Sequence, residues 1–462
     1  MKDLIRTKLA NKKVLLLGFG REGRSSYSLI REVLPQLPLV IADMDENLAA
    51  DPIVNNDDLI TLQLGKDYLE GLEGFDLIMK SPGISLKNLD QNQLKGKITS
   101  QTDLFLQRYR DQVVGVTGTK GKSTTASLIH HILKLEERNS LLTGNIGRPA
   151  FDCIEEIEEN TVIVYELSSH QLEYITNAPH IGLLLNLYKE HLDAYSSYED
   201  YQRAKMNILL FQEETDYFIY NADDSQLTGY IRDFGLVRNY MPFSFETDLV
   251  DGAFIKYGWI WYSEEFIPEP LISLTTKRKL KGNHNVMNIM AAINACKLLE
   301  IDEMTIKEGV AGFNGLEHRL EYVGFFHQIH FYNDSIATIP EASIEAIKAL
   351  SGVDTLIVGG FDRGIDYLEF ARFLGQSKIR NLIFTGEAGK RIGGLFITYC
   401  KEYQKACFIN RFDDFLEIAI SETIPGAICL LSPAAASYDE FTNFEFRGRR
   451  FKELVTGKEN RK

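Results

Sequence analysis

The stretch that decides the fold is residues 113–129, which read VVGVTGTKGKSTTASLI. Its first four residues form an apolar, β-branched run that predicts a buried strand, and the residues from Ala126 onward predict an amphipathic helix. Between them lies a glycine loop, residues 118–124, here called the Lys122 loop. A buried strand, a glycine loop that carries Lys122 and Ser123, and a helix together predict a cradle for nucleotide phosphates.

Each residue type in such a cradle has a distinct task. Backbone N–H groups at the helix N-terminus face the anion, Lys122 neutralises phosphate charge, and the Ser123 hydroxyl suits Mg²⁺. The spacing is G-x-x-G-K-S-T, a shortened form of G-x-x-x-x-G-K-[ST]. A short glycine loop can also be an ordinary turn, but the strand before it and the helix after it favour a phosphate site. The residues predicted to contact the nucleotide here are Gly118, Thr119, Lys120, Gly121, Lys122, Ser123 and Thr124.

Length, composition and charge limit the class of protein. A chain of 462 residues predicts about three domains, and 44% hydrophobic with 25% charged residues is typical of a globular protein in water. The net charge of −15 argues against nucleic acid as a main partner. The sequence has no run of about eighteen apolar residues and no secretion signal at its start, so we expect neither a membrane span nor secretion. The five cysteines are scattered, which favours buried thiols in a reducing cytoplasm.

The N-terminal part follows the opening pattern of a Rossmann fold. Residues 13–18 (KVLLLG) predict a strand that enters the loop GFGREG at residues 18–23, and a helix follows. The next predicted strand ends in Asp43, an acid at the position where a ribose would be held. A third predicted strand stops at Ser81-Pro82-Gly83, at the edge of the sheet where ligands bind. A tight turn without a ligand is the alternative interpretation of this loop.

The central part offers possible metal ligands. Residues 161–166 predict a buried strand that ends in Glu166, where a second Mg²⁺ ligand belongs in a phosphate-loop domain. His191 follows another apolar strand, and Lys205 lies in a predicted helix, residues 198–210. Taken alone, such a histidine is usually structural and such a lysine is usually solvated. Residues 216–275 contain short β-like runs that predict a small antiparallel portion or hairpins.

A polar helix start follows at residues 282–288, which read GNHNVMN. Asn285 and Asn288 lie three residues apart and therefore share a helix face, where an amide can pair with the edge of an adenine. Asparagine is also an ordinary N-cap residue, so this spacing leaves both interpretations open.

The C-terminal part alternates between strands and helices and predicts another doubly wound parallel sheet. Its strand ends carry Asn333-Asp334-Ser335, the glycine-rich residues 359–364, and residues 432–437. Polar, glycine-rich loops at three strand ends indicate a substrate site along one edge of the sheet. We therefore expect an α/β protein of three domains, with residues 1–100 Rossmann-like, residues 101–315 a phosphate-loop ATP-binding domain, and residues 316–462 Rossmann-like.

These motifs resemble those of the Mur ligase family. The resemblance covers nearly the whole chain, and its motifs stand in the family's order. They are residues 118–124, Glu166-Leu-Ser168-Ser169, His191 with Asp193, residues 282–288, His318-Arg319, Asn333-Asp334-Ser335, and the closing run 431–451 (LSPAAASYDEFTNFEFRGRRF). The closing run is most similar to the branch of the family that adds glutamate, whereas G-x-H-N-x-x-N is shared with folylpolyglutamate synthases.

The resemblance implies an ATP-dependent amide ligase of cytoplasmic peptidoglycan precursor synthesis. Such an enzyme adds glutamate, with D-glutamate expected, to UDP-N-acetylmuramoyl-L-alanine through an acyl phosphate. The glycine fingerprint would then bind a uridine nucleotide and not NAD. We expect a monomer without a nucleic acid or membrane partner. A folylpolyglutamate synthase would lack the N-terminal nucleotide domain, and a dinucleotide-dependent oxidoreductase would leave Lys122, Glu166 and Arg319 without a role.

The resemblance also assigns roles to residues. In ATP binding, Asn285 and Asn288 join the Lys122 loop, and Arg319 and Asp334 reach the nucleotide from the third domain. The resemblance implies two Mg²⁺ ions. Their implied ligands are Ser123, Glu166, His191 and a carbamylated Lys205. The implied catalytic residues are Lys122, Glu166, His191 and Lys205. The uridine-nucleotide residues are Gly20, Arg21, Glu22, Asp43, Ser81, Pro82, Gly83, Asn145 and Ser168. The residues implied for the incoming amino acid are Thr338, Arg363, Ser437 and Phe444.

The chain departs from the familiar pattern at the amino-acid site. Ile336 stands where the loop after Asn333-Asp334-Ser335 usually has a lysine, and Arg363 replaces another lysine. The loss of one cation at position 336, and the change of another to a planar guanidinium at position 363, alter how the two carboxylates of a glutamate can be held. Variation that leaves D-glutamate as the substrate is one interpretation. Specificity for L-glutamate is the other.

Overall fold

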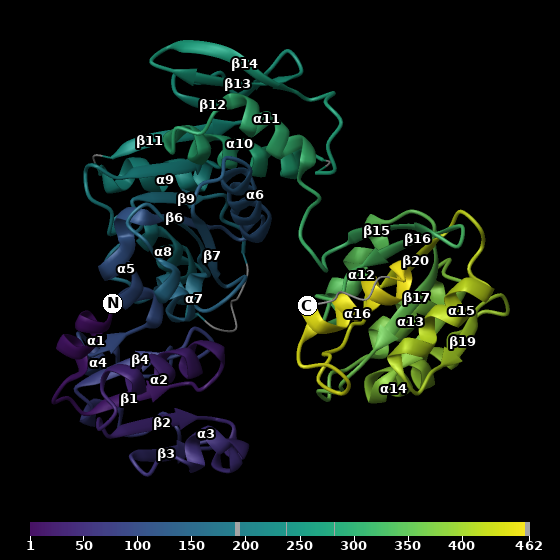
Figure 1. Cartoon of the computed structure of the whole chain (residues 1–462), viewed down its shortest axis with the longest axis horizontal. Helices are drawn as coiled ribbons and strands as arrows, with labels where there is room; N and C mark the ends of the chain where they lie inside the picture. The colour runs from purple at the N-terminus through teal and green to yellow at the C-terminus, as the bar shows by residue number, and fades with distance from the viewer. Residues whose placement is uncertain (190–194, 237, 281, 458–462) are drawn as a thin grey trace. The chain divides into compact units, whose positions relative to one another are not determined.

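The structure is a computed structural model that describes residues 1–189, 195–236, 238–280 and 282–457 (Figure 1). His191 and Asp193 lie outside these residues. The chain divides into two compact units, Met1–Phe313 and Asn314–Lys462. Within the described residues, the strands form sheets of five, nine and six strands, most of them parallel and covered by helices. The predicted α/β class is therefore confirmed.

The N-terminal sheet is parallel throughout, with the strand order β3-β2-β1-β4-β5. Its strands are β1 (Val14–Leu17), β2 (Leu39–Asp43), β3 (Ile60–Leu64), β4 (Leu77–Lys80) and β5 (Ile98–Thr99), and its helices are α1 (Lys2–Leu9), α2 (Arg21–Val33), α3 (Pro52–Asn55) and α4 (Gln91–Leu94). All four residues of β1 are buried, as expected of a central parallel strand with both faces covered. The strand order reverses at β1, which opens a ligand crevice beside its carboxyl end.

The central sheet has the strand order β14-β13-β12-β11-β10-β9-β6-β8-β7. Its strands are β6 (Val113–Thr117), β7 (Ser140–Gly144), β8 (Val162–Glu166), β9 (Ile181–Leu184), β10 (Tyr217–Asn221), β11 (Asn239–Ser244), β12 (Gly252–Lys256), β13 (Trp259–Glu264) and β14 (Ile267–Ser273). The predicted antiparallel portion is confirmed for β12–β14. It is wrong for β10 and β11, which continue the parallel sheet because the helix between them returns the chain in the same direction.

Helices pack on both sides of this sheet. They are α5 (Gln101–Tyr109), α6 (Lys122–Leu135), α7 (Ser169–Leu172), α8 (Tyr198–Leu210), α9 (Ser225–Phe234), α10 (Asn283–Leu298) and α11 (Glu303–Gly312). Helix α10 packs against α6, and almost every residue from Val286 to Cys296 is buried. The Lys122 loop and the Asn285/Asn288 helix are thus held against each other by one apolar core.

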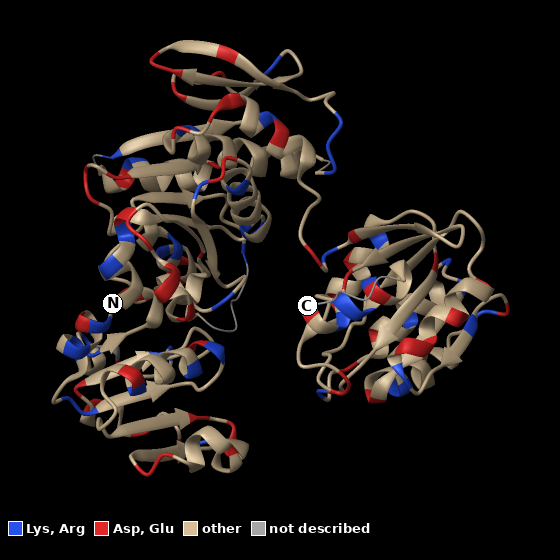
Figure 2. Ribbon diagram, viewed as in Figure 1, with Lys and Arg blue, Asp and Glu red and all other residues tan. Residues whose placement is uncertain are grey.

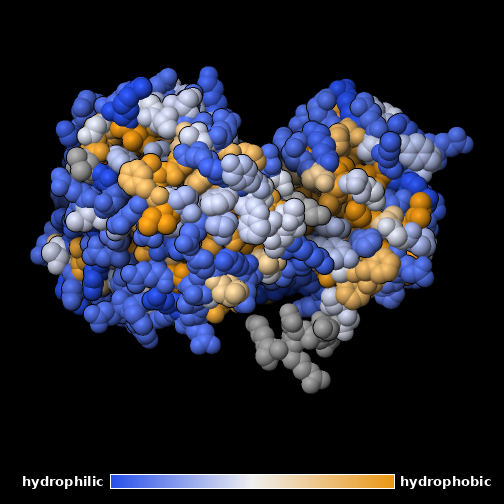
Figure 3. All heavy atoms as spheres, turned by 90° about the horizontal axis from the view of Figure 1, so that it is seen from above, coloured by the Kyte–Doolittle hydropathy of each residue, from blue (hydrophilic) through white to orange (hydrophobic). Residues whose placement is uncertain are grey.

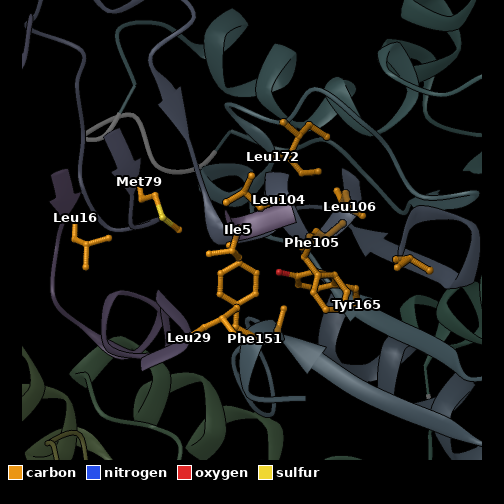
Figure 4. Packing of buried hydrophobic residues seen from close by; sticks show 14 of the residues in the cluster. Ile5, Leu16, Leu29, Met79, Leu104, Phe105, Leu106, Phe151, Tyr165 and Leu172 are labelled. Carbon is orange, nitrogen blue, oxygen red and sulfur yellow. The ribbon is translucent and has the colours of Figure 1, made fainter. Parts of the chain in front are cut away.

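A continuous hydrophobic core joins the N-terminal and central sheets (Figure 4). Ile5, Leu16 and Met79 from the N-terminal side belong to the same cluster as Phe105 and Tyr165 from the central side. The rings of Phe105 and Tyr165 meet edge to face with their centroids 5.6 Å apart. The two sheets therefore form a single compact unit.

The C-terminal unit contains a six-stranded sheet with the order β15-β16-β20-β17-β18-β19. Its strands are β15 (Glu321–Phe326), β16 (Ile329–Asn333), β17 (Val353–Gly359), β18 (Asn381–Thr385), β19 (Lys405–Phe408) and β20 (Ile428–Leu431), and its helices are α12 (Pro340–Ala349), α13 (Leu368–Gln376), α14 (Gly386–Ile397), α15 (Phe415–Glu422) and α16 (Phe444–Thr456). The sheet is parallel apart from the edge strand β15. The carboxyl ends of β16, β20 and β17 lie side by side and place their loops along one edge.

Charges of both signs are interspersed along the ribbons of each unit (Figure 2). The face seen in Figure 3 is mainly hydrophilic, with apolar side chains scattered over it. Exposed aromatic residues include Tyr257 and Phe266, both on the antiparallel hairpins at the end of the central sheet. Among the described residues, no helix is both long and apolar enough to span a bilayer.

Candidate active site

The Lys122 loop joins β6 to α6 in a conformation that depends on its glycines. Gly118 and Gly121 have positive φ angles of 151° and 90°, which side chains rarely adopt. A Cβ atom on Gly121 would lie 2.3 Å from Asn288 Oδ1. Helix α6 begins at Lys122, inside the loop, and Gly121 provides no side-chain cap. The first N–H groups of α6 therefore keep their capacity to bind an anion.

Two lysines meet at this loop. The Lys122 ammonium donates to the carbonyl oxygens of Gly118 and Thr119, each at 2.9 Å. The Lys205 ammonium, on α8, donates to the same Gly118 oxygen at 2.9 Å, and Lys205 is only 2% exposed. Two ammonium groups thus share one carbonyl oxygen, an arrangement that suits the binding of a polyanion.

The loop is also held by Tyr201 and Asn186, for which the sequence predicted no role. The Thr119 hydroxyl lies 2.9 Å from the hydroxyl of Tyr201. The amide side chain of Asn186 accepts from Lys120 N at 2.9 Å and donates to Lys120 O at 3.0 Å. Asn186 follows β9, and its position after an apolar strand was the only signal in the sequence. These contacts hold the loop in place before any ligand binds.

Glu166 lies at the carboxyl end of β8 and is fully buried. Its Oε1 accepts a hydrogen bond from Asn145 Nδ2 at 3.0 Å, and its Oε2 has no partner among the described residues. A buried carboxylate oxygen with an open acceptor position fits a Mg²⁺ ligand. Within the described residues, no three His, Cys, Asp or Glu side chains form a group able to hold a metal. The predicted ligand His191 lies outside those residues.

Asn288 lies beside the Lys122 loop, as its contact with Gly121 requires, and its amide donates to Asn285 Oδ1 at 3.3 Å. Asn288 is buried, whereas Asn285 is partly exposed. The structure therefore brings Asn288, Lys122, Lys205 and the loop together. Which part of a nucleotide the asparagine would contact stays a prediction.

A cavity of about 360 Å³ opens at the carboxyl ends of β1 and β4. The residues that line it are Gly18, Gly20, Arg21, Glu22, Asp43, Ser81, Pro82, Gly83, Ile84, Gly144, Asn145 and Pro149. We call it the N-terminal pocket. It brings together every residue predicted for the uridine nucleotide except Ser168, whose hydroxyl instead caps α7.

Asp43 and the glycine loop support each other in this pocket. Asp43 Oδ2 accepts from Phe19 N at 2.7 Å, and Asp43 Oδ1 accepts from Asp45 N at 3.0 Å. The Ser81 hydroxyl donates to Gly18 O at 2.8 Å. A Cβ atom on Gly23 would lie 2.1 Å from the same oxygen. Glycine at position 23 thus permits the close packing of the loop against α2.

The pocket is built by both sheets of the unit. Gly144, Asn145 and Pro149 belong to the end of β7 in the central sheet and the loop after it. The guanidinium of Arg21 donates to Gly147 O, and Gln171 Nε2 donates to Glu22 Oε1 at 2.6 Å. Burial raises the pKa of the Glu22 carboxyl to about 7, partly opposed by the Gln171 hydrogen bond. Gln171 was missed because its role depends on a contact with a residue 149 positions away.

The C-terminal unit carries its predicted residues on the strand-end loops. Asp334, after β16, accepts from Ser432 Oγ at 2.8 Å and from Leu320 N at 3.1 Å. Burial raises the pKa of its carboxyl to about 6. Arg319 is exposed and directly precedes Leu320, whose backbone N–H binds Asp334. Arg447 lies in the closing run 431–451, but the sequence assigned it no role; it is fully buried behind these loops.

The residues predicted for the amino acid surround the same edge. Arg363 is exposed and its guanidinium lies 5.4 Å from the centre of the Tyr438 ring. Ser437 is buried, and Thr338 and Phe444 are partly exposed. Phe444 also contacts His318 edge to face, with the ring centroids 6.3 Å apart.

Comparison with known proteins gives consistent matches. The Mur ligase middle domain family matches residues 116–296. The UDP-N-acetylmuramoylalanine--D-glutamate ligase of Clostridium botulinum strain Hall is 31% identical over 451 residues, covering 96% of each chain. The protein of the same name from Thermoanaerobacter sp. strain X514 is 33% identical over 455 residues, covering 97% of this chain and 98% of that one.

Solved structures share the fold at lower identity. UDP-N-acetylmuramate-alanine ligase MurC from Thermotoga maritima aligns with a TM-score of 0.53 at 19% identity, covering 97% of this chain and all of the other. MurF from Acinetobacter baumannii aligns with a TM-score of 0.55 at 17% identity, covering 93% of this chain and 88% of the other. At this level of identity the likeness concerns the fold alone.

Proposed function

The chain belongs to the Mur ligase family, and we propose that it joins D-glutamate to UDP-N-acetylmuramoyl-L-alanine with conversion of ATP to ADP and phosphate. The observation that carries this proposal is the similarity, over nearly the full length of both chains, to ligases named for that reaction. The reaction builds a peptidoglycan precursor. We further propose a monomer that acts in the cytoplasm, with domains at residues 1–100, 101–315 and 316–462.

The chemistry begins with a carboxylate that must be activated, because hydroxide is a poor leaving group. Transfer of the γ-phosphoryl group of ATP to the L-alanyl carboxylate gives an acyl phosphate, which the amine of glutamate attacks with release of phosphate. Lys122 and the N–H groups of its loop would stabilise charge on the transferring phosphoryl group. Asn285 and Asn288 would hold the adenine, with Arg319 and Asp334 contributing from the C-terminal unit.

Ser123, Glu166 and His191 are the proposed Mg²⁺ ligands, and the ions would neutralise charge on the phosphates. The open Oε2 of Glu166 supports this assignment. We also propose that Lys205 carries a carbamate. The modification would turn one of the two ammonium groups at Gly118 O into an anion, which adds a metal-binding group beside the phosphate loop.

The N-terminal pocket is the proposed site of the uridine nucleotide, and Ser168 is proposed to bind the same substrate. The proposed amino-acid site consists of Thr338, Arg363, Ser437 and Phe444. An L-glutamate-adding enzyme is the second candidate, because Ile336 and Arg363 stand at two positions where the family pattern usually has lysine. We propose that domain closure brings together reactants bound on separate domains and excludes water from the acyl phosphate.

The test is phosphate release by the purified protein with ATP, Mg²⁺ and UDP-N-acetylmuramoyl-L-alanine, comparing D-glutamate with L-glutamate. We expect turnover with D-glutamate alone. Turnover with L-glutamate alone would favour the second candidate and make Ile336 and Arg363 the positions to exchange. Phosphate release with neither amino acid would contradict the proposed function.

A further inference from the structure

Arg447 is a buried cation in the first turn of α16. Its side chain is 2% exposed, and its hydrogen bonds go to oxygen atoms of uncharged groups. Asp439, whose charge acts on Arg447, is exposed to solvent. Burial lowers the pKa of the Arg447 guanidinium to about 9, against an opposing effect of Asp439. A buried positive charge without a carboxylate bonded to it is costly, so a specific use is expected.

The guanidinium joins the loops that follow three neighbouring strands. After β16, Ser335 accepts two hydrogen bonds, from Nε to its hydroxyl and from Nη2 to its carbonyl, both at 3.0 Å. After β20, Ala435 and Ala436 accept through their carbonyl oxygens, each at 3.0 Å. After β17, Gly360 packs so closely that a Cβ atom there would lie 2.9 Å from Nη1.

The same three loops carry the proposed amino-acid site. Thr338 follows Ser335, Arg363 follows Gly360, and Ser437 follows Ala436. The loops are also joined directly, because Phe361 N donates to Ala436 O at 2.9 Å. One planar group with five donors thus sets the spacing of the loops. Its charge lies directly behind the edge where a substrate with two carboxylates would bind.

We propose that Arg447 is a positioning residue for the acceptor amino acid, which holds the three loops in register and gives the site its preference for an acidic side chain. The inference rests on the proposed function, because it assumes that glutamate binds at this edge. Arg447 acts through the loop backbone and through its field, and does not itself contact the substrate. The field of an unpaired buried cation reaches further than that of a surface charge, because solvent does not screen it.

The test compares D-glutamate with D-glutamine, which has the same shape but lacks the second charge, in phosphate release by the full chain. Arg447→Met is expected to raise the KM for D-glutamate about ten- to a hundred-fold. The preference of kcat/KM for glutamate over glutamine should fall about ten-fold. The KM values for ATP and for the uridine nucleotide should stay unchanged. Arg447→Lys, which keeps the charge but loses most of the hydrogen bonds, should raise the KM for glutamate and retain the preference.

Arg449→Met is the matched control. Arg449 is on the same helix, but it is exposed and its guanidinium stacks on Phe446 at 4.2 Å. This variant should behave as the wild type does. Circular dichroism and thermal melting show whether each variant is folded, and Arg447→Lys decides the outcome if Arg447→Met does not fold.

An unchanged preference in Arg447→Met, or an unchanged KM for glutamate in Arg447→Lys, would overturn the inference. So would a loss that affects glutamate, glutamine and ATP equally, since that indicates general damage to the unit. A wild-type protein without turnover would contradict the proposed function itself. If the wild type is active and the Arg447 variants have the same kinetic constants as the wild type, only the inference is contradicted.

Discussion

Gly23 offers a sharp test of how the N-terminal pocket is built. In a Gly23→Ala variant, the new Cβ atom would lie 2.1 Å from Gly18 O, where ordinary contact begins at 3.4 Å. A gap of about 1.3 Å must therefore open between the loop and α2. Gly18 O cannot move aside without losing the hydrogen bond from the Ser81 hydroxyl, and Gly18 N is held by Ala42 O at 2.8 Å.

Overpacking against backbone of this kind costs about 1–3 kcal/mol, and we expect that loss in the free energy of unfolding of the Met1–Phe313 unit. The Gly23→Ala variant should also bind the uridine nucleotide more weakly. A displacement of about 1 Å misaligns the N–H groups and the pocket wall, so the affinity for UDP should fall at least about ten-fold. Thermal melting followed by circular dichroism measures the first effect, and isothermal titration calorimetry with UDP measures the second.

Gly20 provides the matched control in the same loop. Its φ angle is −73°, and no atom lies within 4 Å of a Cβ atom placed there. Gly20→Ala should therefore melt at the wild-type temperature. If Gly23→Ala melts and binds UDP as the wild type does, close packing against Gly18 O is not the reason for glycine at this position.

Lys122 and Glu22 give two further predictions. Lys122→Met should lower the rate of phosphate release about 10²–10³-fold, because it removes a cation from the phosphate site. Lys134→Met, exposed on the last turn of α6, should retain wild-type activity, and equal rates for the two variants would contradict the assignment. Since burial raises the pKa of the Glu22 carboxyl from 4.5 to about 7, the folded chain holds this proton more tightly than the unfolded chain. The free energy of unfolding should thus fall by up to about 3 kcal/mol as the pH rises between these two values. In urea titrations at several pH values, Glu22→Gln should remove this dependence of the free energy of unfolding on pH. The same pH dependence in the wild type and the variant would refute the prediction.

Much of the architecture was predictable because its signals are local. A glycine loop between a strand and a helix, as at residues 18–23 and in the Lys122 loop, requires only neighbouring residues. The carboxyl ends of parallel strands meet at one edge, so the strand ends at Asp43 and Ser81 predicted a shared ligand crevice, whereas Arg21 was assigned by the family resemblance. The predicted helix starts were less accurate. Helices α2 and α6 begin inside their glycine loops, whereas glycine in the sequence indicated a break before each helix.

Partners at long range were not predictable from a pattern. Residues 217–244 contain two short β-like runs that suit a hairpin as well as a parallel pair, and only the packing of α9 and α10 selects the parallel arrangement. Gln171 was passed over because nothing near it in the sequence indicates its bond to Glu22. Arg447 was passed over because arginine on a terminal helix is usually exposed.

The sequence by itself therefore determined the strand–loop–helix units and predicted which residues carry the chemistry, because loops and strand ends depend on short stretches of chain. The tertiary structure alone decided what those residues face. Lys122 and Lys205 are far apart in sequence yet share the oxygen of Gly118, and Arg447 reaches Ser335 across more than a hundred residues. Such contacts arise when separate elements bury their apolar faces against one another, and that packing brings together charges and donors whose proximity no local pattern encodes.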